Sequence, residues 1–85
     1  MQYCKKFQSI DEFVDCLSRG GEVEFLYRNK AYSITHYARS ISVMEAYNES
    51  SRKQFSSPQG TLEYDLGDKK LKEVLSDLAI TFRTF

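Results

Sequence analysis

Residues 22–37 read E-V-E-F-L-Y-R-N-K-A-Y-S-I-T-H-Y, two runs in which polar and apolar side chains alternate around a turn. Alternation with a period of two is typical of strands that bury one face, so the stretch predicts a β-hairpin. Asn29 is the residue best suited to the left-handed backbone of the reversal, because the stretch contains no glycine.

Two registers fit this hairpin. A loop at Asn29-Lys30 places Tyr27 opposite Tyr32, whereas a loop at Arg28-Asn29 shifts the pairing by two residues. A shift of two leaves every side chain on the same face of the sheet. In both registers the inward side chains are Val23, Phe25, Tyr27, Tyr32 and Ile34.

An amphipathic helix is predicted on each side of the hairpin. Ser9-Ile10-Asp11-Glu12 fits a capping box, and apolar side chains follow at helical spacing as far as Leu17. Gly20-Gly21 ends this helix, with Gly20 placed for a left-handed cap. Asp68 is the predicted N-cap of the second helix, whose apolar stripe runs over 71–78.

Shorter segments complete the chain. Residues 41–46 predict a third strand after a reversal at 38–40, and 79–85 alternate as a C-terminal strand with Ile80 and Phe82 on one side and Thr81 and Arg83 on the other. Residues 48–57 have no period and many hydrogen-bonding side chains, which indicates a loop. Ser57-Pro58 predicts the start of one or two helical turns.

The resulting order is α-β-β-β-(α)-α-β, in a chain whose 85 residues make one small domain. Both helices need an apolar surface, and one face of the sheet supplies it for both. We therefore predict an α+β two-layer fold, an antiparallel sheet of three to four strands packed against two amphipathic helices.

Composition excludes several classes of function. Twelve basic and twelve acidic residues balance, so no global field steers the chain to nucleic acid or acidic lipid. No run approaches the roughly 20 apolar residues of a membrane span, and the start lacks the apolar core of a secretion signal. We expect a cytoplasmic protein without a membrane anchor.

The residues best suited to catalysis form no known motif. Two cysteines, Cys4 in the lead-in 1–8 and Cys16 in the helix, cannot close a zinc site with the single His36. The lead-in reads as a short edge strand or an irregular arm, and a disulfide is not expected in the cytoplasm. As a general base His36 would need a nucleophile and an orienting acid, and the sequence identifies neither. We expect a protein that is not an enzyme, with no metal and no cofactor.

Aromatic residues indicate protein recognition instead. Six tyrosines and six phenylalanines are more than so small a core hides easily, and exposed aromatics are common interface anchors. Tyr47 and Phe55 bracket the polar loop, although Phe55 folding under its own loop is an alternative. Phe85 also has no inward assignment. The predicted partner-binding residues are Tyr37, Tyr47, Glu49, Arg52, Lys53 and Phe55.

A single-stranded nucleic-acid surface around the hairpin is the alternative, with tyrosines available for stacking. Glu22, Glu24 and Glu45 lie on the same strands and would repel phosphate, which favours protein recognition. The candidate nucleic-acid-binding residues are Arg28, Lys30, Arg39 and Arg83.

The run S-I-D-E-F-V-D-C-L-S-R-G-G-E-V-E-F-L-Y-R-N-K-A-Y-S-I, followed by G-D-K-K-L-K-E-V-L, resembles small orphan proteins of phages and mobile elements in Gram-positive bacteria. Their pattern is a helix, rGxEieFxYngkxYsI, a variable middle and dGkxLkei. The resemblance covers residues 9–37 and 66–78. The chain departs from it at Arg28-Asn29, where Asn-Gly is common.

The resemblance implies a context and no catalytic residues. Small phage proteins without cofactors are often inhibitors that bind a host protein, including anti-CRISPR and other anti-defence proteins. The resemblance thus implies a non-enzymatic binder that inhibits a host defence protein such as a CRISPR-Cas nuclease. A single-stranded nucleic-acid-binding or regulatory accessory module and a small immunity protein are the alternatives. Monomer and homodimer stay open, because an edge strand can pair two copies.

Overall fold

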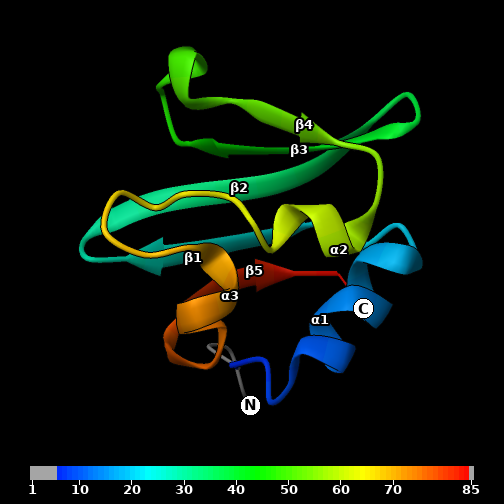
Figure 1. Ribbon diagram of the computed structural model, residues 1–85, viewed down its shortest axis with the longest axis horizontal. Helices are drawn as coiled ribbons and strands as arrows, with labels where there is room; N and C mark the ends of the chain where they lie inside the picture. Colours follow the sequence, from blue (N-terminus) through cyan, green and yellow to red (C-terminus); the bar gives the residue numbers. More distant parts are fainter. Residues whose placement is uncertain (1–5, 85) are drawn as a thin grey trace.

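Five strands form one antiparallel sheet in the computed structural model, which describes residues 6–84 (Figure 1). Their order across the sheet is β4-β3-β2-β1-β5. The strands are β1 (Val23–Tyr27), β2 (Lys30–Tyr37), β3 (Ser40–Glu45), β4 (Lys53–Phe55) and β5 (Ala79–Arg83). The helical segments are α1 (Ile10–Ser18), α2 (Pro58–Thr61) and α3 (Leu71–Val74), with 3₁₀ turns η1 (Glu49–Ser51) and η2 (Leu75–Asp77).

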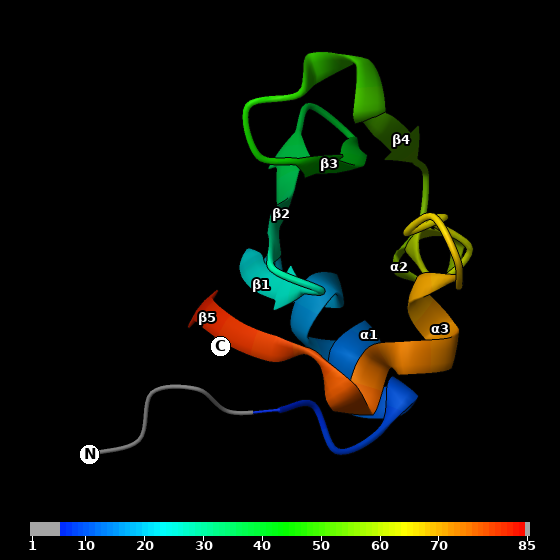
Figure 2. The same cartoon turned by 90° about the vertical axis from the view of Figure 1, so that its left-hand side faces the viewer.

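The helices lie on one side of the sheet, and the other side is left open (Figure 2). This arrangement confirms the predicted α+β class. The sheet has five strands rather than three to four. None of the helices in residues 6–84 is long and apolar enough to cross a membrane.

The central hairpin has the second of the two predicted registers. Tyr27 pairs with Lys30, so Arg28-Asn29 is the loop and the Asn29-Lys30 version is wrong. Both loop residues have positive φ, 52° and 66°, as the tight hairpin turn that matches strand twist requires. The next reversal is also a two-residue loop, with Tyr37 paired to Ser40, but of its two residues only Ala38 has positive φ, 55°.

The first helix begins and ends where the sequence predicts. Ser9 Oγ accepts from the Glu12 N–H at 3.1 Å, while the Glu12 carboxylate accepts from the Gln8 N–H at 2.7 Å. Gly20 caps the other end at φ 84°, and the Gly21 N–H donates to the Cys16 carbonyl at 3.0 Å.

Residues 48–57, predicted to be a loop, contain η1 and the edge strand β4. β4 has three residues, too few for an alternation to be visible, and two of them are exposed. It pairs with β3, placing Phe55 beside Ile41 and Lys53 beside Val43. The loop interpretation of this stretch is therefore wrong in part.

The second helix is shorter than predicted and begins later. Lys70, not Asp68, is the N-cap residue of α3, and the Glu73 carboxylate accepts from the Lys70 N–H at 3.0 Å. The Asp68 carboxylate instead accepts from the Tyr27 hydroxyl at 2.9 Å and pairs with Arg28 at 2.9 Å. These contacts tie the segment before α3 to the hairpin turn.

The last strand contains a bulge that moves Phe82 and Arg83 to the faces opposite to those predicted. Phe25 pairs with Ile80 but Glu24 pairs with Phe82, so Thr81 is an extra residue. Phe82 consequently lies on the outer face with Glu24, and not beside Ile80. Beyond the bulge, Arg83 is opposite Val23, on the helix side.

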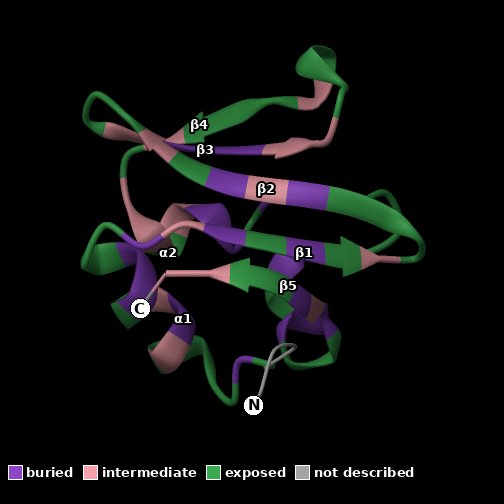
Figure 3. Ribbon diagram, turned by 180° about the vertical axis from the view of Figure 1, so that it is seen from behind, coloured by how far each residue is buried: buried purple, intermediate pink, exposed green. Residues whose placement is uncertain are grey.

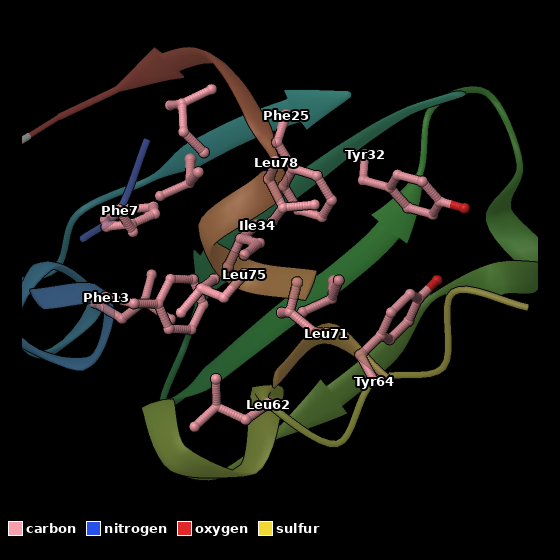
Figure 4. Close-up of a cluster of buried hydrophobic side chains, with 14 of the residues drawn as sticks. Phe7, Phe13, Phe25, Tyr32, Ile34, Leu62, Tyr64, Leu71, Leu75 and Leu78 are labelled. Carbon is pink, nitrogen blue, oxygen red and sulfur yellow. The ribbon is translucent and has the colours of Figure 1, made fainter. Parts of the chain in front are cut away.

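One hydrophobic core fills the space between sheet and helices (Figure 4). Phe7 is buried and meets Phe13 edge to face, with ring centroids 5.2 Å apart. Of the lead-in, residues 1–5 lie outside the described range, and residues 6–8 form no strand. The fully buried large side chains include Phe7, Phe13, Leu17, Phe25, Ile34, Leu71, Leu78 and Ile80.

Candidate functional site

Tyr47 is the most exposed large hydrophobic residue in the described part of the molecule. It lies two residues after the end of β3, and its relative exposure is 103%. Its backbone has φ 63°, a left-handed conformation that costs a bulky residue free energy. The fold gains no burial from this side chain.

The connection that carries Tyr47 is tied to the sheet and to the core. Ser51 Oγ accepts from the Glu45 N–H at 2.8 Å and donates to the Asn48 carbonyl at 2.7 Å. The Tyr64 hydroxyl donates to the Ser51 carbonyl at 2.9 Å. Tyr64 itself is buried, and this burial raises the pKa of its phenol. The loop that carries Tyr47 is thus held by hydrogen bonds to the sheet and to a core tyrosine.

The loop that carries Tyr47 also contains charged side chains. Glu49 and Arg52 form an ion pair at 3.1 Å, with side-chain exposures of 75% and 43%. An exposed pair of this kind contributes little to stability, so both groups stay accessible to a partner. Lys53 is exposed on β4 and forms no ion pair within residues 6–84. We define the Tyr47 loop as residues 47–53.

Two of the predicted partner-binding residues lie away from this loop. Phe55 is partly buried and packs against the core, beside Gly60 of α2, which agrees with the alternative that it folds under its own loop. Tyr37 is 70% exposed at the far end of β2, next to the β2–β3 turn. Tyr47, Glu49, Arg52 and Lys53 therefore lie in the Tyr47 loop, in which Glu49 and Arg52 are paired, whereas Tyr37 and Phe55 lie outside it. Phe85 lies outside the described residues.

The four candidate nucleic-acid-binding residues are not gathered on one surface. Arg28 and Lys30 lie at the β1–β2 turn, and Arg39 lies at the β2–β3 turn, at the opposite end of the sheet. Arg83 packs on the helix side, with its guanidinium 4.3 Å from the Phe7 ring centroid and 3.2 Å from Glu12.

His36 and Cys16 both contact backbone. His36 Nε2 lies 3.0 Å from the Gly21 carbonyl oxygen. Cys16 is a buried free thiol that donates to the Thr84 carbonyl at 3.3 Å, and burial raises its pKa. Within residues 6–84 no three His, Cys, Asp or Glu side chains come close enough to hold a metal ion.

Two surface residues escaped the sequence reasoning. Leu26 and Phe82 are 41% and 47% exposed on the open face of the sheet. The exposure of Leu26 could have been predicted from the sequence, because Leu26 is an apolar residue at an outward position of the hairpin. The exposure of Phe82 could not, because the bulge at Thr81 decides which face Phe82 lies on.

No family model matches the chain, and no curated protein or solved structure matches it either. The functional surface is therefore inferred from the geometry and the side-chain chemistry of the structure.

Proposed function

We propose that this chain is a non-enzymatic protein-recognition module that contacts its partner through the Tyr47 loop. One observation carries the proposal: a fully exposed tyrosine at φ 63° on a hydrogen-bonded loop. Tyrosine is among the residues most enriched at interface hot spots, because it supplies a large rigid contact area and a hydroxyl.

The surroundings of Tyr47 fit this role. Glu49, Arg52 and Lys53 give the loop both signs of charge around an aromatic centre, the usual composition of an interface rim. The dispersal of Arg28, Arg39 and Arg83 favours a protein partner over a phosphate backbone, which needs clustered cations.

The class of partner follows from the resemblance to phage and mobile-element proteins. We propose a host defence protein, such as a CRISPR-Cas nuclease, that this chain inhibits by occupying its surface. An exposed tyrosine on a hydrogen-bonded loop is compatible with inhibition by occlusion.

The test is capture of partners by the tagged protein from a lysate of a CRISPR-bearing Gram-positive host, with and without added nuclease. A stoichiometric protein should be retained by the wild type after nuclease treatment and lost with Tyr47→Ala. Tyr37→Ala is the matched control, because it removes another exposed tyrosine at the other end of the sheet.

Three outcomes would contradict the proposal. Retention by Tyr47→Ala would remove the loop from the binding site. Loss only with Tyr37→Ala would place the site at the β2–β3 turn. Recovery that disappears with nuclease would assign the chain to nucleic-acid binding.

A further inference from the structure

The face of the sheet opposite the helices is open to solvent (Figure 3). Its outward positions near β1 carry Glu24, Leu26, Met44 and Phe82, which we call the outer patch. Glu24 pairs with Phe82 on one side and with Ser33 on the other, and Ser33 pairs with Met44. Leu26 and Phe82 are two of the five exposed large hydrophobic residues in the described chain.

The β5 bulge supplies one of these side chains. Regular alternation after the inward Ile80 would turn Thr81 outward and Phe82 into the core. The extra residue leaves Thr81 exposed and places Phe82 outward beside Glu24. Bulges commonly redirect a side chain at a functional surface, and this one exposes a phenylalanine that regular pairing would bury.

The outward strand positions in the described part of the sheet carry negative charge and no positive charge. The strand positions that face outward within residues 6–84 include the carboxylate of Glu24 and no lysine or arginine. Glu24 forms no ion pair with another residue in that range, whereas the nearby Arg28 is paired with Asp68. The patch is thus an apolar surface with a single negative charge among its side chains.

The exposed apolar side chains and the carboxylate of Glu24 decide which kind of partner can cover the outer patch. Covering the patch removes Glu24 from water, and a buried carboxylate without a counter-charge is strongly unfavourable. A second copy stacked face to face by a two-fold axis would bring two Glu24 side chains into the same interface. Nucleic acid would add phosphates to a face without cations. An occupant that supplies a cation between apolar groups meets both requirements.

We propose that the outer patch binds a basic, amphipathic segment of another protein. Leu26 and Phe82 contact the apolar side chains of that segment, and Glu24 accepts from its arginine or lysine. Arginine fits best, because its planar guanidinium binds a carboxylate through two parallel hydrogen bonds. This surface is separate from the Tyr47 loop, so the inference goes beyond the function proposed above.

The experiment selects short random peptides from a display library on the immobilised protein and measures each selected peptide by calorimetry. The wild type should select peptides that combine arginine or lysine with apolar residues. Glu24→Arg should weaken those peptides by about tenfold or more, since the attraction becomes a repulsion. Selection repeated on Glu24→Arg should yield acidic peptides instead.

Matched variants locate the binding. Glu49→Arg makes the same chemical change on the Tyr47 loop and should leave peptide affinity unchanged, as should Tyr47→Ala. Replacing Leu26 and Phe82 together by serine should abolish binding, with circular dichroism confirming the fold. The proposal would be overturned if the library yields no binders or if the selected peptides lack basic residues. It would also be overturned if Glu49→Arg lowers peptide affinity as much as Glu24→Arg does. A dimer in sedimentation that Phe82→Ser dissociates would overturn it as well.

Discussion

The Tyr64 hydroxyl donates to the Ser51 carbonyl at 2.9 Å and so joins the short segment before α3 to the loop that carries Tyr47. The ring of Tyr64 is buried and faces that of Tyr32 edge to face, with centroids 6.3 Å apart. A side chain fixed in the core thus holds a surface loop in place through its polar end.

Tyr64→Phe removes this hydroxyl and keeps the packed ring. The loss of one hydrogen bond should lower the free energy of unfolding by about 1 kcal/mol, and the Ser51 amide should exchange faster. Urea unfolding and amide hydrogen exchange measure the two effects. Tyr32→Phe is the control, because the Tyr32 hydroxyl makes no hydrogen bond to Ser51. Unchanged exchange at Ser51 would mean that the loop does not depend on Tyr64.

Tyr47→Gly should make the protein more stable while it weakens partner binding. Glycine adopts positive φ without the steric cost that tyrosine has, and no buried contact is lost, so we expect a gain of about 1 kcal/mol. Ala38→Gly, at φ 55°, should give a similar gain and leave binding intact. Thermal unfolding and partner capture provide the comparison. A destabilised Tyr47→Gly variant would show that the tyrosine serves the fold.

The sequence predicts the hairpin and α1 well because each of them combines several local signals. Ser9, the apolar spacing and Gly20 all agree on one helix. In the hairpin the alternation fixes the faces, whereas the loop position depends on which residues adopt positive φ. Arg28 is not a residue that favours such a backbone, so the register could not be chosen in advance.

The elements that were missed depend on distant contacts. β4 is a strand because three residues meet the edge of β3, and nothing in K-Q-F requires it. The bulge at Thr81 places Arg83 against Glu12 and Phe7, a pairing between residues far apart in the chain. Of the candidate site, the exposure of Tyr47 follows from the sequence. The packing of Phe55 against the core was one of two alternatives. The sequence could not decide between them, because Phe55 packs beside Gly60 of α2.

Gly21→Ala should destabilise the fold more than Gly20→Ala does. A Cβ on Gly21 would lie 2.7 Å from the carbonyl oxygens of both Cys16 and Thr84, which are backbone atoms that cannot move freely. We expect a loss of about 1–3 kcal/mol, as in an overpacked core. Gly20 has open space around it, and its φ of 84° alone should cost about 1 kcal/mol. Equal losses in urea unfolding would contradict the steric argument.

Acid should weaken the fold partly through Glu12. The Gln8 N–H lowers the pKa of the Glu12 carboxyl below its ordinary 4.5, and Arg83 lowers it further, while burial opposes both. Because the folded protein binds this proton less readily than the unfolded chain, the contribution is present above the unfolded pKa. It is lost as the pH falls through the folded pKa.

Glu12→Gln should therefore be less stable than the wild type at about pH 7, and the difference should be smaller at about pH 3, below the ordinary pKa of 4.5, where the unfolded chain already binds this proton. Urea unfolding at the two pH values measures this convergence. The same variant should release Arg83 from its ion pair, so its deficit at neutral pH should also decrease at high salt, where exposed charges are screened. A deficit that persists unchanged in acid would mean that Glu12 contributes through shape rather than through its charge.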